Sequence, residues 1–290
     1  MNLPGAILFI IAVLLIGLLP ATLLYRLSDL LRFTALHILR YRTDLVRKNL
    51  TSSFPGITDK ELKRLTSLYY KNLAYNIIEG IWAFTISKKQ IKKRYRIINP
   101  EVLKPFSISG QSIIGVTGHY SNWEWGSLAA SLHTDFKVIA FYKQMNNKYI
   151  DKFARWSRSR FGTTLISIKD TTLSFEKYKD PKTLFLMAAD QGMPKQFSDR
   201  AFWIQFLNHN IPFLHGMEKH ARNNNLPVIY IDVRREMRGW YAVELTVLTA
   251  NPLELENGKL TEMYAGKLES VILKKPEDWL WSHNRFKLSR

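Results

Sequence analysis

The sequence contains no cysteine, which excludes a disulfide framework, a thiolate metal site and a cysteine nucleophile. It also contains no G-x-S-x-G turn, no P-loop and no G-x-G-x-x-G fingerprint. Acyl-enzyme hydrolases, nucleotide phosphoryl transferases and dinucleotide oxidoreductases therefore lack their usual motifs here. Internal repeats and low-complexity tracts are absent as well. With 290 residues and 46% apolar content, the chain is long enough to bury one good-sized core.

Acidic residues are scarce relative to basic ones. Lys and Arg number 42 against 24 Asp and Glu, a formal net charge of +18. Such an excess favours a polyanionic partner: nucleic acid, an anionic membrane surface or an acidic carrier protein. No recognised nucleic-acid-binding motif is present and an apolar N-terminal segment points to a membrane, so we expect no nucleic-acid partner.

An uncharged run, "LPGAILFIIAVLLIGLLPATLL", extends from Leu3 to Leu24. At about 1.5 Å per helical residue it is long enough to cross a hydrocarbon core of roughly 30 Å, so we predict a transmembrane anchor over residues 1–25. A cleaved signal peptide is the alternative, but no Lys or Arg precedes the run and no clear small-x-small site follows it. The basic residues after the run predict, by the positive-inside rule, a single-pass protein whose body faces the cytoplasm and lies against anionic lipid.

Residues 26–98 are predicted to form a helical, membrane-proximal region. Apolar residues recur at three- and four-residue spacing in "LYRLSDLLRFTALHIL" and "ELKRLTSLYYKNLAYNIIEGIWAF". A loop, "SSFPGITDKE", separates them, and Thr58 and Glu61 fit a capping box that opens the second helix. The basic stretch "SKKQIKKRYR" ends the region and is interpreted as a linker with a solvated face, where nearness to a membrane favours lipid contact.

Short β-type runs alternate with helical segments over residues 99–290. The runs are "SIIGVT", "KVIAFY", "TLISI", "TLFLMAA" and "PVIYIDV". Helices are predicted at "NKYIDKFARWSRSRFG" and "PFLHGMEKHARNNN". This alternation predicts an α/β core with a mostly parallel central sheet flanked by helices, in one globular unit with residues 26–98.

The segment "GHYSNWEWG" places His119 and Glu124 directly after a predicted strand, where α/β sheets usually hold ligands. Five residues along one regular helix would turn the two side chains about 140° apart. If the helix begins near Ser121, Glu124 lies in its first turn and can reach the imidazole. The structural alternative is a capping box, in which Ser121 and Glu124 bond only backbone groups, and the two interpretations are compatible.

A histidine–carboxylate pair without a protein nucleophile suits direct attack by a substrate hydroxyl. Histidine would remove the proton as the oxygen attacks an activated acyl carbonyl, and nearby donors would hold the oxyanion. The rival from a different functional class is a non-catalytic membrane-surface module that uses the +18 charge to dock anionic lipid or a carrier protein.

"GHYSNWEWG" resembles the H-x4-D/E motif of the lysophospholipid acyltransferase superfamily. Its tryptophan-rich, glutamate-ended form is similar to the lipid A secondary (lauroyl/myristoyl-type) acyltransferases of Gram-negative bacteria. Further segments resemble this family's elements: "VRKNLTSSFPGITDKE" (R-x-N-L…F-P), "AADQGMPK" (D-Q/D-H), "RREMRGWYAVEL" (an arginine-then-tyrosine strand pair) and "PEDWLWSHNRFK" (W-x-W-x-H-x-R-x-K). The F-P-E-G-T-R phosphate-binding segment of glycerophospholipid acyltransferases is not found, which favours the lipid A-type branch.

The resemblance implies that His119 is the general base and Glu124 its partner. It implies substrate-binding roles for Trp123, Arg160 (with Arg158 as the alternative arginine), Asp190, Gln191 and Arg234. Without the resemblance, Arg160 fits a helix-end cation and Asp190 a strand-end turn former.

The resemblance also implies partners and a location. The acyl donor would be acyl-carrier protein or coenzyme A, and the acceptor a hydroxyl of a lipid A precursor at the cell inner membrane. No metal or redox cofactor is expected, because the thioester already supplies activation. An aminolipid or a lysophospholipid is the alternative acceptor.

Two other groups carry weaker signals. His215, Glu218 and His220 in "HGMEKH" do not share one tight ligand face, so a surface helix is expected rather than a metal site. Trp279, Trp281 and His283 fit an interfacial belt or a substrate wall, but aromatic residues at this spacing most often pack in a core.

Overall fold

The computed structural model describes residues 3–178, 182–193, 195–196 and 201–289, and a seven-stranded sheet lies at its centre. The strand order is β1-β9-β8-β2-β5-β3-β4. The strands from β8 to β4 run parallel, β9 pairs antiparallel with β8, and β1 pairs parallel with β9. The strands are β1 (Tyr95–Ile97), β2 (Ile113–Thr117), β3 (Lys137–Tyr142), β4 (Thr164–Ser167), β5 (Thr183–Ala188), β8 (Val228–Met237) and β9 (Trp240–Thr249). The predicted mostly parallel sheet is confirmed.

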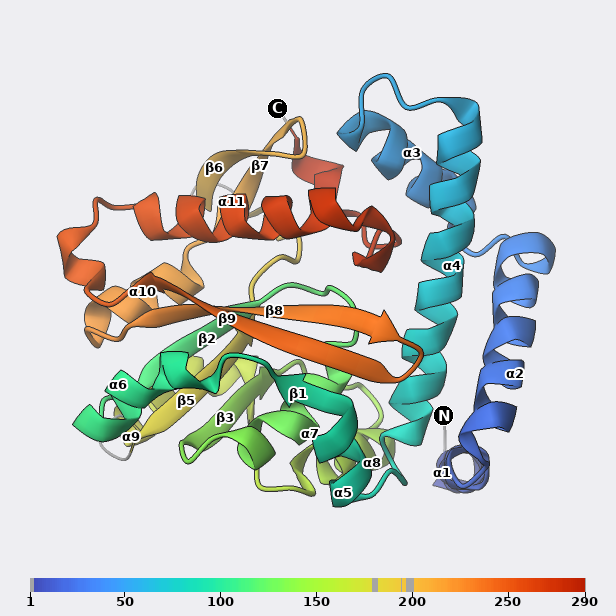
Figure 1. Ribbon diagram of the computed structural model, residues 1–290, viewed down its shortest axis with the longest axis horizontal. Helices are drawn as coiled ribbons and strands as arrows, with labels where there is room; N and C mark the ends of the chain where they lie inside the picture. Colours follow the sequence, from blue (N-terminus) through green and yellow to red (C-terminus); the bar gives the residue numbers. More distant parts are fainter. Residues whose placement is uncertain (1–2, 179–181, 194, 197–200, 290) are drawn as a thin grey trace.

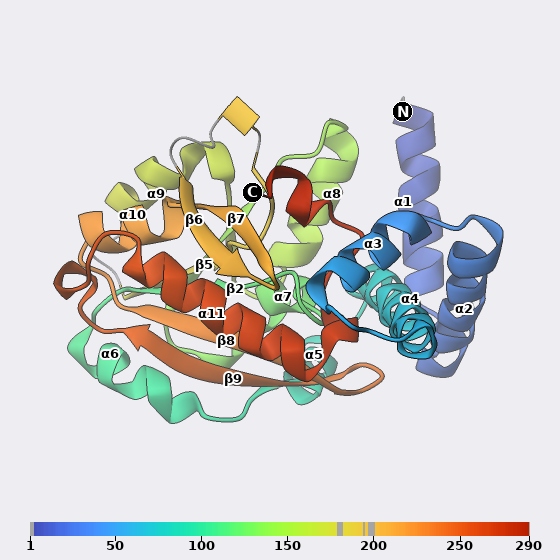
Figure 2. The same cartoon turned by 90° about the horizontal axis from the view of Figure 1, so that it is seen from above.

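Helices cover both faces of this sheet (Figure 1). In Figure 1, α11 and a separate hairpin of β6 (Ala201–Phe206) and β7 (His209–Leu214) lie above the sheet, and α5 and α7 lie below it. The α-helices are α1 (Leu3–Gly17), α2 (Ala21–Phe33), α3 (Thr43–Ser53), α4 (Asp59–Trp82), α5 (Lys88–Arg94), α6 (Lys104–Ser109), α7 (Glu124–His133), α8 (Lys148–Ser159), α9 (Thr171–Tyr178), α10 (Gly216–Asn223) and α11 (Lys259–Lys274). Helix α4 stands at the end of the sheet to which β8 points, with α2 outside it, as Figure 2 also shows from above.

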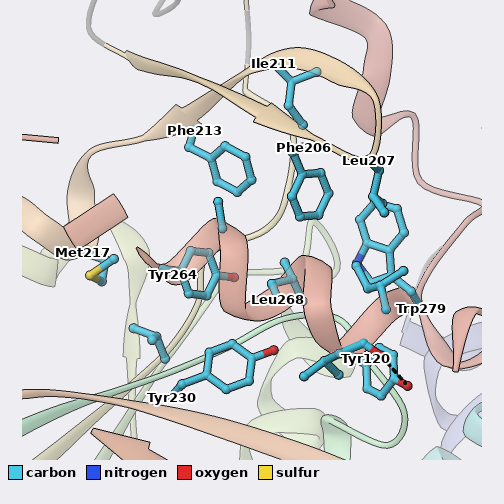
Figure 3. Close-up of a cluster of buried hydrophobic side chains, with 14 of the residues drawn as sticks. Tyr120, Phe206, Leu207, Ile211, Phe213, Met217, Tyr230, Tyr264, Leu268 and Trp279 are labelled. Carbon is cyan, nitrogen blue, oxygen red and sulfur yellow. Dashed lines mark hydrogen bonds between the residues drawn. The ribbon is translucent and has the colours of Figure 1, made fainter. Parts of the chain in front are cut away.

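The central strand β2 is buried on both faces, as expected of a strand inside a parallel sheet. Alternate side chains point to opposite faces. Ile114 belongs to the cluster that includes Tyr264 and Leu268 of α11, and Ile113 to the cluster that includes Trp125 of α7. Figure 3 shows the first cluster, in which aromatic side chains of the β6–β7 hairpin face α11. This packing on both faces holds β2 between the two helical layers.

The predicted continuous helix from Leu3 to Leu24 is interrupted. Helix α1 ends at Gly17 and α2 begins at Ala21, with Pro20 in an extended conformation (φ −55°, ψ 146°) between them. Proline lacks an N–H and disfavours helical geometry in the residue before it. No single helix of the described chain is long and apolar enough to cross a membrane. A π-helical turn, Thr34–Ile38, continues α2, and only the pair Leu3–Gly17 and Ala21–Ile38, bent by 120°, passes that test by length and composition. The anchor itself stays a prediction.

The structure tests the predicted N-cap of α4 and the predicted basic linker. The Thr58 hydroxyl accepts a hydrogen bond from the Glu61 N–H at 3.3 Å, so the predicted N-cap of α4 is confirmed. The basic stretch is not a linker, because its lysines form α5, which Ser87 caps, and it continues into β1.

The helix predicted at "PFLHGMEKHARNNN" begins later than expected. Residues 212–214 belong to β7, where they pair with residues 201–203 of β6, and α10 starts only at Gly216. A three-residue apolar run carries too little periodicity to distinguish a strand from a helix.

Candidate active site

The candidate site forms where β2 and β5 end side by side. The two strands are parallel neighbours, with Thr117 beside Ala188 in the register. Two residues beyond these positions, the chain reaches His119 on one side and Asp190 on the other. Both therefore project from the carboxyl-end edge of the sheet, the edge at which α/β proteins bind ligands.

His119 and Asp190 make two contacts. The imidazole Nδ1 lies 2.5 Å from the Asp190 Oδ1, and the backbone N–H of His119 donates to Oδ2 at 2.8 Å. The glycine at position 118 permits this approach, because a Cβ there would lie 3.2 Å from the Asp190 Oδ2 and 2.7 Å from a methyl group of Leu268. Asp190, predicted as a substrate-binding residue, is thus the direct partner of the predicted base.

The second ring nitrogen of His119 faces the predicted substrate-binding residue Gln191. The Gln191 amide nitrogen lies 2.9 Å from His119 Nε2. A carboxylate only accepts hydrogen bonds, so Nδ1 carries the proton that faces Asp190, and Nε2 of the neutral ring is then the acceptor that faces the Gln191 amide. This is the tautomer that a histidine base requires, with the lone pair of Nε2 directed at the exposed Gln191.

The electrostatics of the pair follow from burial and mutual charge. Burial alone would lower the pKa of His119, but the charge and hydrogen bond of Asp190, followed by the charge of Glu124, outweigh it and raise this pKa above 6.5. Burial alone would raise the pKa of Asp190. The charge and hydrogen bond of His119, together with the N–H of Trp279, instead lower it to about 2. Asp190 is therefore a carboxylate over the physiological range.

Glu124 does not reach the His119 ring. Its carboxylate accepts hydrogen bonds from Arg158 Nε at 3.1 Å and Nη2 at 2.7 Å. The expected contact fails because α7 begins at Glu124 itself, three residues later than the predicted start. Ser121 is instead in the left-handed region (φ 54°), so the capping box is not formed either. Glu124 acts on His119 through its charge alone.

The two remaining arginines predicted for the site have other partners. Arg160 ends α8 and donates to the carbonyls of Ala83 and Ile86, at 2.6 and 3.0 Å. Arg234 of β8 donates to Asp232 at 2.9 Å and pairs with Glu244. Within the described residues, no hydrogen bond or ion pair joins either arginine to His119 or Asp190. Of the alternatives at the end of α8, Arg158 is the arginine that meets the motif.

Aromatic side chains border the pair. The predicted substrate-binding residue Trp123 lies edge-on to the His119 ring, with centroids 5.2 Å apart. Trp279 is buried, as the packing interpretation predicts, but its indole N–H also donates to Asp190 Oδ2 at 2.9 Å. His283 accepts from the N–H of Gly192 at 3.0 Å. Both side chains therefore contact the segment that carries Asp190, which their spacing alone does not reveal.

The C-terminal segment also holds the loop that carries His119. Tyr120 and Trp279 form an antiparallel bridge, and the N–H of Leu280 donates to the carbonyl of His119 at 3.1 Å. Asn49 of α3, from the "VRKNL" segment, donates to the carbonyls of Trp281 and His283 at 2.9 and 3.2 Å. Segments from both ends of the chain thus meet at the site.

The histidine–glutamate group of "HGMEKH" has a structural explanation. Glu218 is buried and accepts from the N–H groups of Gly258 and Thr261, so it caps the start of α11. The expected surface helix forms as α10, with Lys219 and Asn223 exposed on one face and Glu218 and His220 buried on the other. In the described part of the chain, no three His, Asp or Glu side chains converge as metal ligands.

Comparison with known proteins decides the family. A model of the bacterial lipid A biosynthesis acyltransferases matches residues 3–288. The chain belongs to this family. Among curated relatives, it is 22% identical over 272 residues to the lipid A biosynthesis lauroyltransferase of Escherichia coli strain K12, which covers 93% of this chain and 87% of that protein. It is also 22% identical over 255 residues to the palmitoleoyltransferase of the same organism and to a lipid A biosynthesis acyltransferase of Shigella flexneri, covering 86% of this chain and 80% of each relative.

Membership makes the chain an acyltransferase and supports acyl transfer in lipid A synthesis. In this chain, segments that carry the resemblance come together in space. The His119 loop, the Asp190 turn and Trp279 of the C-terminal segment meet within hydrogen-bonding distance.

Proposed function

We propose that this acyltransferase moves a fatty acyl chain from acyl-carrier protein to a hydroxyl of a lipid A precursor, with His119 as general base. The observation that carries the proposal is the His119–Asp190 contact at the carboxyl edge of the sheet. The acceptor is most simply the hydroxyl of a 3-hydroxyacyl chain already attached to the precursor. No metal or redox cofactor is required by this chemistry, because a thioester is an activated acyl group.

The proposed reaction follows the polarity of the histidine. The acceptor hydroxyl takes the place of the Gln191 amide at His119 Nε2, which removes its proton as the oxygen attacks the thioester carbonyl. Asp190 stabilises the imidazolium that forms. Collapse of the tetrahedral intermediate breaks the carbon–sulfur bond, and the proton passes from Nε2 to the leaving sulfur. The products are the ester and the free thiol.

Glu124 retains a role in the proposal without touching the imidazole. Its charge raises the pKa of His119 and so favours the protonated ring of the transition state. The bidentate contact with Arg158 holds that charge in one place. The catalytic base is then His119 with Asp190 in contact and Glu124 as an anionic neighbour.

Membrane attachment through α1 and α2 completes the proposal. Large apolar side chains on these helices face outward, including Leu8 and Leu15 on α1 and Leu30 on α2, which are 70%, 63% and 60% exposed. Such a surface favours contact with lipid. Basic residues after Leu24 support a body on the cytoplasmic face of the inner membrane, with anionic lipid as a further partner.

Mass spectrometry of lipid A tests the function. Cells without the gene should lack one secondary acyl chain, and wild-type protein should restore it whereas His119→Ala should not. The mass of the missing chain gives its length. An unchanged lipid A profile contradicts the assignment of a lipid A precursor as acceptor. Transfer by the purified protein to an aminolipid or a lysophospholipid would then identify the true acceptor. Full restoration by His119→Ala would favour the non-catalytic membrane module.

A further inference from the structure

Three polar side chains lie along one face of α4, of which two bond the loop between β2 and α7 and one bonds Asp278. Asn72, Asn76 and Glu79 are spaced by four and three residues, so they lie along one stripe of the helix. Glu79 is fully buried. A buried carboxylate is costly unless it is paired and hydrogen-bonded, so its partners must offset that cost.

The partners of Glu79 come from separate elements. Tyr25 of α2 donates to Oε1 at 2.8 Å, and Asn122 of the His119 loop donates to Oε2 at 2.7 Å. Tyr241 of β9 also donates to Oε2, and the guanidinium of Arg235 lies 3.6 Å from it. One carboxylate therefore joins the outer helix α2, the sheet and the loop of the candidate site.

The other two residues of the stripe hold the turn at Ser121. Asn76 donates to the carbonyl of Ser121 at 2.7 Å, and the N–H of Ser121 donates to the carbonyl of Asp278 at 2.7 Å. Asn72 donates to the Asp278 carboxylate at 2.9 Å. The left-handed backbone of Ser121 costs a non-glycine residue about 1–2 kcal/mol, so these contacts must maintain it. The turn lies two residues beyond His119.

We infer that Glu79 is a positioning residue that fixes the His119 loop through Asn122 and couples this loop to α2 through Tyr25. It touches neither the imidazole nor the position of the acceptor. The inference rests on the proposed function only in using turnover as one readout.

A double-mutant cycle tests the coupling in the purified full chain. Tyr25→Phe and Asn122→Ala each remove one donor from Glu79, and each should lower kcat about 3- to 30-fold with KM for the donor nearly unchanged. Because both act through the same carboxylate, the double variant should lose less than the product of the two single losses. Glu79→Gln, which keeps the shape but not the charge, should lose more than either.

The matched control is Tyr75→Phe. The Tyr75 ring packs edge-on against Tyr25 at 5.7 Å, and within the described chain its hydroxyl makes no hydrogen bond to Glu79. It should therefore retain wild-type kcat. Multiplicative effects in the cycle, or a loss in Tyr75→Phe as large as that in Tyr25→Phe, would overturn the coupling.

Amide hydrogen exchange provides a readout that does not depend on the reaction. Tyr25→Phe should accelerate exchange in residues 119–125, although Tyr25 lies on another helix, and Tyr75→Phe should not. Unchanged exchange in that loop would contradict the inference. If His119→Ala kept full turnover, the proposed function would fail while the exchange experiment would still decide the role of Glu79.

Discussion

At the scale of single residues, two carboxylates near His119 have different environments. Asp190 is 3% exposed and contacts the imidazole, whereas the Glu124 side chain is 33% exposed and contacts Arg158. A buried charge in direct contact is little screened, whereas a partly exposed charge at a distance is weakened by water and salt. Asp190 should therefore dominate both the tautomer and the basicity of His119.

The variant Asp190→Asn should shift the pH dependence of turnover. In the wild type, the raised pKa of His119 keeps the ring protonated, and inactive as a base, up to a pH above 6.5. Without the aspartate charge, burial dominates and the pKa falls, so the acidic limb of kcat/KM should move to lower pH. The maximum rate should fall on the order of 10² to 10⁴-fold because the tautomer is lost. A pH–rate profile measures both, and an acidic limb at the wild-type position would refute the assignment.

The variant Glu124→Gln tests a charge that acts without contact. Removing it should lower kcat by about 10- to 100-fold and move the acidic limb slightly downward, because the charge raises the pKa of His119. Arg158→Gln provides the control for the ion pair, since it leaves the Glu124 charge but frees its position. If Glu124→Gln retained wild-type kcat/KM at every pH, the glutamate would have only a structural role.

At the scale of secondary-structure elements, the segment after α11 supports the His119 loop and donates to Asp190. Trp279→Phe keeps an aromatic ring in the core but removes the N–H donor to Asp190. We expect kcat to fall about 3- to 30-fold and the free energy of unfolding to fall by about 1–2 kcal/mol. Trp281→Phe is the control, because its N–H donates to the carbonyl of Pro276 instead. It should lose similar stability in denaturant titration but little kcat, and an equal loss of kcat in both variants would argue against a role for the indole of Trp279.

Sequence patterns predict the strands and helices better than they predict which of these elements lie side by side in the fold. The strand before His119 follows from its β-branched run, but the partner Asp190 lies 71 positions later. Their contact depends on β5 inserting between β2 and β3, and hydrophobic periodicity does not determine strand order. The predicted contact between Glu124 and His119 depends on where α7 begins, and the first residue of a helix is the feature that a sequence predicts least reliably. Hydropathy does not reveal the break at Pro20, because it measures composition rather than backbone hydrogen bonding.

At the scale of the whole molecule, the candidate site and the outward apolar surface lie near the same side of the fold. Helix α4 contacts the His119 loop through its polar stripe and packs against α2, whose Leu30 and Phe33 are exposed. In Figures 1 and 2, the N-terminal helices stand on this side of the sheet. A lipid acceptor held in a membrane at α1 and α2 would therefore approach the site from the nearby end of the sheet.

The chain has 42 basic and 24 acidic residues, and this excess of positive charge leads to a prediction about the donor. Acidic acyl-carrier protein should be attracted by long-range electrostatics that accelerate encounter more than they tighten the final complex. Salt should therefore lower kcat/KM for the carrier-bound donor, since the Debye length falls from about 10 Å at 0.1 M to about 3 Å at 1 M. Turnover at saturating donor should change less.

The measurement is kcat/KM against ionic strength in neutral detergent with saturating acceptor, and acyl-coenzyme A, a smaller thioester donor, provides the comparison. A flat profile for the carrier would mean that the positive charge serves the bilayer and the acceptor instead, because a surface that recruits an acidic protein must lose that advantage as ions screen it.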